Sequence, residues 1–105
     1  MNPDETQKMM EQARVMQERV EQIQKTLNAR RFEATSGGGM VRATVSGALR
    51  VLSIEIEDAF FRAGDKPMIQ DLAAAAINAA IVKAQEGANE EFVRMQQHLM
   101  NGTGF

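Results

Sequence analysis

Residues 41–56 read VRATVSGALRVLSIEI, and apolar residues take every second position on either side of a short break. These positions are Val41, Ala43 and Val45 before the break and Leu52, Ile54 and Ile56 after it. A period of two is typical of β-strands with one buried face. Gly47 and Ala48 separate the two runs, and glycine in the first position of a two-residue loop favours a type II′ turn. The stretch therefore predicts an antiparallel hairpin.

The length of the turn predicts the register of this hairpin. With a two-residue loop, Ala43 pairs with Leu52. The same register pairs Val41 with Ile54, so both apolar sets lie on one face. A shift by one residue would move one set to the opposite face, and the turn and the hydrophobic pattern therefore agree.

A third strand is predicted before the hairpin, because Phe32 and Ala34 alternate with polar residues. Three consecutive glycines, Gly37-Gly38-Gly39, then interrupt the pattern. No Lys-Ser/Thr pair follows them and no helix begins there, so the phosphate-loop and dinucleotide fingerprints are both absent. We interpret the glycines as a flexible connection between strands; backbone approach to a nucleic-acid phosphate is the alternative. The whole sheet is expected within residues 31–57.

Two long helices are predicted to flank the sheet, over residues 1–29 and 66–100. Asn2 is a good N-cap and Pro3 suits the first helical position. The first helix carries apolar residues at spacings of three and four: Met9, Ala13, Met16, Val20, Ile23 and Leu27. We expect this stripe to pack on the domain or on a dimer partner.

The second helix is apolar nearly all round over residues 72–82, so we expect it to be buried on more than one side. Residues 101–105 are expected to form a frayed tail. The order of elements is α-β-β-β-α in a single domain, residues 1–105. This pattern predicts a two-layer α+β protomer with a three-stranded antiparallel sheet.

Composition limits the classes of function. The chain has 105 residues, a formal net charge of −2 and no cysteine, which excludes disulfides and cysteine–zinc sites. No apolar run reaches the roughly 20 residues of a membrane helix, and the polar N-terminus is unlike a signal peptide. We therefore expect a cytoplasmic protein. Dimerisation would bury more surface than so short a chain can bury alone.

Basic residues gather within residues 25–50, where only Glu33 opposes them: Lys25, Arg30, Arg31, Arg42 and Arg50. If the fold brings them to one surface, it creates a positive field on an acidic protein. On the first helix, by contrast, acidic residues stand three or four positions from Arg14 and from Lys25. That helix face is interpreted as a solvated, locally paired surface, with phosphate contact as the alternative.

Catalysis and metal binding have little support. His98 is the only histidine and has no cysteine and no cluster of carboxylates near it in the sequence, whereas a metal site needs three or four converging ligands. Glu55, Glu57 and Asp58 are close together, but nothing supplies a nucleophile, base or electrophile beside them. We expect no catalytic residue, no metal site and no cofactor.

Four segments, in order along the chain, resemble the YbaB/EbfC family: QARVMQE at 12–18, GGGMVRATVSG at 37–47, VLSIEIED at 51–58 and MIQDLAAAAINAA at 68–80. The resemblance implies small bacterial nucleoid-associated proteins, homodimers of an α-β-β-β-α protomer that bind double-stranded DNA. It also implies roles in nucleoid organisation and gene regulation. The chain departs from the family at Ala59, where proline is common, and in its short tail.

The expected function is non-enzymatic binding of duplex DNA at the nucleoid, as a homodimer, mainly through phosphates. The residues expected to contact DNA are Arg30, Arg31, Lys25 and Arg42, followed by Arg14 and Arg19. The alternative is a protein-interaction module whose long helices recruit a protein partner, with little or no DNA binding. No membrane and no small-molecule substrate are expected.

Overall fold

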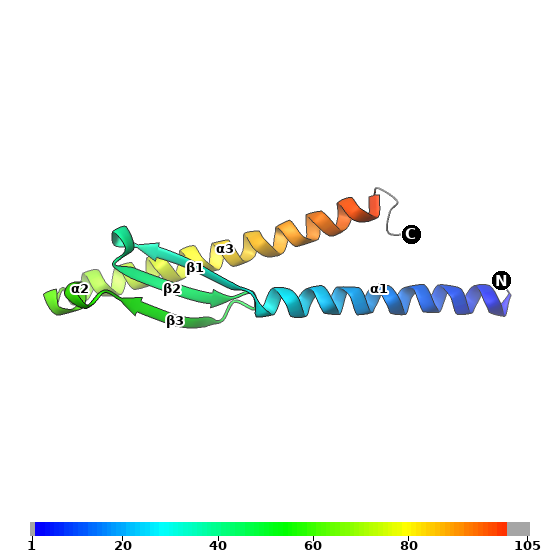
Figure 1. Cartoon of the computed structure of the whole chain (residues 1–105), viewed down its shortest axis with the longest axis horizontal. Helices are drawn as coiled ribbons and strands as arrows, with labels where there is room; N and C mark the ends of the chain where they lie inside the picture. The colour runs from blue at the N-terminus through cyan, green and yellow to red at the C-terminus, as the bar shows by residue number, and fades with distance from the viewer. Residues whose placement is uncertain (1, 101–105) are drawn as a thin grey trace.

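A computed structural model describes residues 2–100 of the chain. Its elements are α1 (Pro3–Ala29), β1 (Arg31–Ser36), a short 3-10 turn η1 (Gly37–Gly39), β2 (Val41–Ser46), β3 (Val51–Ile56), α2 (Asp58–Ala63) and α3 (Lys66–Met100). Figure 1 shows α1 and the C-terminal part of α3 leaving the sheet in the same direction, with α2 at the opposite end. The α+β architecture is confirmed, and α2 adds a short helix between the predicted sheet and the second predicted long helix. The tail expected at 101–105 lies outside the described residues.

The start of α1 follows from its capping residues. The Asn2 side-chain oxygen accepts a hydrogen bond from the Glu5 backbone N–H at 2.9 Å, and Pro3 occupies the first turn. The helix ends at Ala29, and Arg30 already has an extended backbone that leads straight into β1. The predicted N-cap is therefore confirmed.

The three strands form one antiparallel sheet in the order β1-β2-β3. β2 lies in the middle and holds Val41, Ala43 and Val45, none of which is exposed. The turn between β1 and β2 has a positive φ at each of its three glycines, 60°, 69° and 96°. Side chains other than that of glycine rarely adopt this region of φ, which explains why three glycines stand here in a row.

The predicted register of the β2–β3 hairpin is wrong by two residues. Ala43 pairs with Ile54 and Val41 with Ile56. The loop is longer than expected, since the Leu49 N–H donates to the Ser46 carbonyl oxygen at 2.9 Å, and the register shifts again between Thr44 and Val45. Between Val41 and Thr44 a shift of two keeps the side chains on their predicted faces, because side chains alternate with a period of two. Beyond the bulge the pattern changes, and Val51 rather than Leu52 lies opposite Val45.

The predicted type II′ turn is also wrong. That turn requires a positive φ at Gly47, and the positive φ lies at Leu49 instead, at 63°. A three-residue loop ending in a left-handed residue is the other common hairpin geometry. Gly47 serves a different purpose: a Cβ there would lie 1.7 Å from the carbonyl oxygen of Leu27 at the end of α1. The glycine permits contact between the hairpin and α1.

Helix α3 packs across β1 and β2 through small residues. Ala76, Ala80 and Ala84 recur every fourth position and are at most 1% exposed, which brings the helix close to the sheet. At Gly87 a Cβ would lie 2.7 Å from the ring of Phe32, so this position also needs a residue without a side chain. The core thus consists of α3 packed on two of the three strands, together with Phe60 of α2.

Burial of α3 on several sides is not found within the single chain. Ala74 and Ala75 are exposed and Val82 is 49% exposed, because only one layer, the sheet, is available to cover the helix. The apolar stripe of α1 is similarly open, with Val20 at 42% exposure and Leu27 the only buried residue of that helix. Both helices therefore present apolar surface outside the core.

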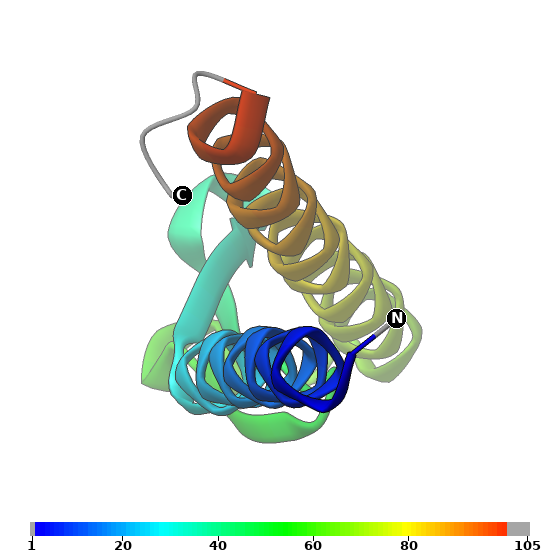
Figure 2. The ribbon, with the colours of Figure 1, turned by 90° about the vertical axis from the view of Figure 1, so that its right-hand side faces the viewer.

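The protomer is extended as a result. Its radius of gyration is 20.9 Å and it measures 74 × 22 × 16 Å. A compact domain of this length would have a radius of gyration of about 13 Å. Figure 1 shows α1 and the C-terminal part of α3 projecting beyond the sheet, and the end view in Figure 2 shows that the two helices are separate rods.

Candidate nucleic-acid interface

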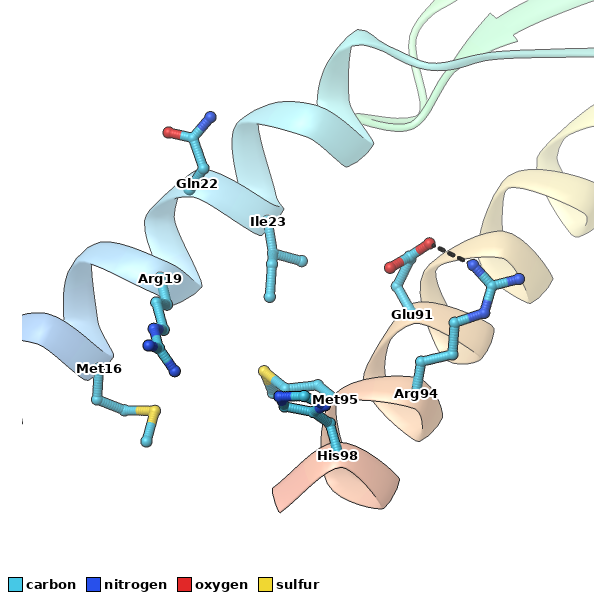
Figure 3. Close-up of a pocket in the computed structure, with 8 residues that line it drawn as sticks. All are labelled: Met16, Arg19, Gln22, Ile23, Glu91, Arg94, Met95 and His98. Atoms are coloured by element: carbon cyan, nitrogen blue, oxygen red, sulfur yellow. Dashed lines mark hydrogen bonds and ion pairs between the residues drawn. The ribbon is translucent and has the colours of Figure 1, made fainter. Parts of the chain in front are cut away.

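A cavity of about 460 Å³ separates the projecting parts of α1 and α3. Figure 3 shows side chains from both helices directed into the gap between them. The lining residues are Met16, Arg19, Gln22 and Ile23 on α1 and Glu91, Arg94, Met95 and His98 on α3. The apolar side chains in this lining, Met16, Ile23 and Met95, are of the kind that pack against the side chains of another helix.

The six basic residues predicted to contact DNA do not form one surface. Arg14 lies between two carboxylates, hydrogen-bonded to Glu11 and to Glu18 at 2.7 Å. The hydrogen bond to Glu11 and the charges of both glutamates raise the pKa of Arg14 above its ordinary value. Its positive charge is therefore balanced locally.

Arg30 and Arg31 are neighbours in sequence but are separated by the sheet. The guanidinium of Arg30 lies over the ring of Phe32, 4.8 Å from its centroid, on the side where Phe32 meets α3. This cation–π contact holds the side chain against the domain. Arg31 begins β1 opposite Ser46, and strand alternation directs its side chain to the other face from that of Phe32.

The sheet face opposite α3, here called the outer face, carries balanced charge. Arg42 lies 3.7 Å from Glu55 on the neighbouring strand, and both side chains are at least half exposed. Arg31 and Glu33 alternate onto the same face from β1. With two arginines and two glutamates, the outer face has no net charge.

The hairpin loop brings a further arginine to the point where α1 meets the sheet. The Ser46 N–H donates to the Arg50 carbonyl oxygen at 2.9 Å, and Ser46 itself pairs with Arg31. The Gly47 N–H donates to the Arg30 carbonyl oxygen at 3.0 Å. The backbones of Arg30, Arg31 and Arg50 thus lie close together where α1 meets the sheet, although the side chains of Arg30 and Arg31 lie on different faces. We call these three residues the junction arginines.

None of the junction arginines forms an ion pair with another residue between 2 and 100. Arg50 belongs to the basic group of residues 25–50, but the sequence did not predict it to contact DNA. The signal that identifies it is the close approach of the hairpin loop to the end of α1, which Gly47 makes possible.

The remaining two predicted residues lie on α1. Lys25 is exposed, and the described part of the chain gives it no ion pair. Arg19 lines the cavity that faces Met95 and His98 on α3. In the part of the chain that the structure describes, no group of three His, Cys, Asp or Glu residues is placed to hold a metal ion.

Comparison with known proteins decides the family. Residues 1–99 match the YbaB/EbfC DNA-binding family. The chain belongs to this family. Membership agrees with the expectation that the protein is not an enzyme, and it confirms the resemblance seen in the sequence.

Relatives of this YbaB/EbfC chain are named nucleoid-associated proteins. One from Pelotomaculum thermopropionicum is 37% identical over 92 residues, covering 88% of each chain. Another, from Chlorobium phaeobacteroides, is 39% identical over 94 residues, which is 90% of this chain and 83% of the relative.

A solved structure supports the fold independently. The crystal structure of the uncharacterized protein HP0035 from Helicobacter pylori matches with a TM-score of 0.63 at 22% identity, covering 79% of this chain and 96% of that one. At this identity the match shows the fold alone. None of the helices within residues 2–100 combines the length and apolar character needed to cross a bilayer.

Proposed function

We propose that this YbaB/EbfC protein binds double-stranded DNA as a homodimer, mainly through phosphates, and thereby contributes to nucleoid organisation and gene regulation. Family membership supports DNA binding, and the names of the relatives support a place at the nucleoid. The extended protomer, with apolar surface on both long helices, supports association of two copies.

The observation that carries phosphate contact is the placement of the junction arginines. The protein has a net charge of −2, so its overall field does not attract DNA. Three arginines without carboxylate partners in the described chain are nevertheless anchored by their backbones at the base of α1. Phosphate contacts of this kind fix a protein on a duplex without reading its sequence.

The predicted contact residues differ in how available their charges are. Arg31 and Lys25 are exposed and have no ion pair in the described chain, so they rank first beside Arg50. Arg30 is held over Phe32 and needs a side-chain movement to reach a phosphate. Arg42 and Arg14 rank lower because each forms an ion pair with a glutamate. Arg19 also ranks lower because it lines the cavity between the helices.

The test is fluorescence anisotropy of a labelled random duplex, titrated with protein at several salt concentrations. Labelled DNA is needed because the chain has no Trp or Tyr to report binding. Binding by phosphates predicts that log K falls linearly with log salt, with a slope of about −0.9 for each phosphate neutralised. Tight binding without dependence on salt would contradict phosphate contact.

The apolar cavity between α1 and α3 supports a second candidate, a module that recruits a protein helix. The same titration separates the two candidates. Absence of duplex binding at low salt, together with co-purification of one protein partner, would favour the interaction module over DNA binding.

A further inference from the structure

Strand β1 forms one edge of the sheet, because β2 is its only strand partner within residues 2–100. The Gly47 N–H donates to the Arg30 carbonyl oxygen at 3.0 Å, so the backbone of residue 30 bonds on the β2 side. Backbone groups of an antiparallel strand point alternately toward and away from the neighbouring strand. The N–H and carbonyl groups of Arg31, Glu33 and Thr35 therefore point away from β2, toward the edge of the sheet.

The acceptor near the middle of this edge is occupied. The Glu33 carbonyl oxygen accepts a hydrogen bond from the Lys83 ammonium of α3 at 2.9 Å. The amide nitrogen of an added strand would lie about 2.9 Å from the same oxygen. The Lys83 nitrogen thus takes the position of the backbone donor that an added strand would supply.

The surroundings of Lys83 make this contact hard to displace. Its neighbour Ala84 is only 1% exposed, which fixes this turn of α3 against the sheet. The Ser36 hydroxyl donates to the Leu72 carbonyl oxygen at 2.6 Å and ties the end of β1 to the same helix. Lys83 has no ion pair with another residue between 2 and 100. An added strand would therefore enclose an ammonium group without a charge partner, which is unfavourable.

The β1 edge would otherwise suit a second copy of itself. If two β1 strands paired antiparallel with Phe32 on the two-fold axis, Arg31 of each copy would face the partner's Glu33. Opposite charges directly across an antiparallel pair are stabilising. In that register the Arg31 N–H of the added copy would bond to the Glu33 carbonyl oxygen, which is the group that Lys83 already occupies.

We propose that Lys83 closes the β1 edge and thereby prevents strand addition by further copies of this chain. An unpaired strand edge is a template for another strand, and lysine is a common means of protecting it. The role is separate from DNA binding and does not depend on which other surface joins copies of the protein. Loss of the ammonium is expected to open the edge and to join existing assemblies into larger ones.

The test is the mass of Lys83→Met, measured by light scattering at several protein concentrations. Methionine keeps a long unbranched side chain on an exposed helix position and removes the ammonium, so the variant is expected to fold as judged by circular dichroism. Because each strand addition joins at least one more copy, we expect at least about twice the mass of the unsubstituted protein. The mass should also rise with protein concentration.

Two matched variants separate the edge contact from a simple loss of charge. Lys83→Arg retains a long cationic donor and should keep the original mass. Lys66→Met removes the same charge and adds the same side chain at an exposed position at the start of α3, and it should also keep the original mass. Assembly of either of these variants to the extent seen for Lys83→Met would contradict the proposal.

A second substitution tests whether the larger assemblies form through β1. The Thr35 N–H points away from β2, so proline at position 35 removes a donor from the edge and none from the β1–β2 pairing. Adding Thr35→Pro to Lys83→Met should therefore restore the original mass. A double variant that still assembles would show that the association uses another surface.

Two further outcomes overturn the proposal. A Lys83→Met protein with the original mass at every concentration would show that the ammonium does not close the edge. In the unsubstituted protein, NMR should detect a coupling across the hydrogen bond between the Lys83 nitrogen and the Glu33 carbonyl carbon. Absence of this coupling would remove the contact itself, and this measurement does not depend on the folding of any variant.

Discussion

At the scale of single residues, availability of charge matters more than its position in the sequence. Arg30 and Arg31 are adjacent, yet one lies over Phe32 while the other alternates to the outer face. Arg50 is distant in sequence, but the hairpin loop returns it to the same corner. A linear count of basic residues therefore does not show which of the side chains share a face of the sheet.

The double substitution Arg31→Ala with Arg50→Ala should weaken binding to all duplex sequences alike. Both side chains are exposed and have no ion pair in the described chain, so each can neutralise a phosphate. The salt dependence should flatten by about 0.9 for each phosphate that the variant no longer neutralises. Anisotropy with two unrelated duplexes measures both effects. Arg62→Ala, at the α2 end of the sheet in Figure 1, is the control and should bind as the original protein does.

Gly47→Ala should be strongly destabilising. The added Cβ would meet the Leu27 carbonyl oxygen at 1.7 Å, and backbone atoms cannot move aside as a flexible side chain would. We expect a loss of more than about 2 kcal/mol in the free energy of unfolding, as measured by urea denaturation followed by circular dichroism. Ala48→Gly, in the same loop, is the control with a smaller effect. Equal stability of the two variants would contradict the close approach.

At the scale of elements, the sequence predicted the type and order of the long helices and strands, because hydrophobic periodicity reports them directly. The predicted hairpin register differs from the observed one by two residues, because Gly47 has the pattern of a turn residue but permits the contact with α1. Such a contact joins residues distant in the sequence. The predicted DNA-contacting residues remain a prediction, and their separation by the sheet has no signal in a linear pattern.

The alanine stripe of α3 gives a prediction for this element. Ala80 is fully buried against the sheet, so Ala80→Leu should cost about 1–3 kcal/mol through overpacking. Ala79→Leu places the same side chain on the exposed surface and should change stability by no more than about 0.5 kcal/mol. Urea denaturation of both variants measures the difference. A destabilised Ala79→Leu protein would indicate that a second layer covers that side of α3.

At the scale of the whole molecule, shape and surface point to association. A radius of gyration of 20.9 Å, where a compact chain would have about 13 Å, means that much of the chain lies outside a common core. The apolar residues on α1, on α3 and along β3 remain partly exposed in one copy. A second copy can cover them without changing the fold of the first.

Association makes stability depend on protein concentration. If two folded chains bind each other and unfolded chains do not, the midpoint temperature of unfolding must rise with concentration by mass action. We expect the midpoint temperature to rise steadily as the protein concentration is raised about a hundredfold. Far-ultraviolet circular dichroism is the suitable measurement because the chain lacks Trp and Tyr. A midpoint independent of concentration in the original protein would mean that the extended protomer is stable alone.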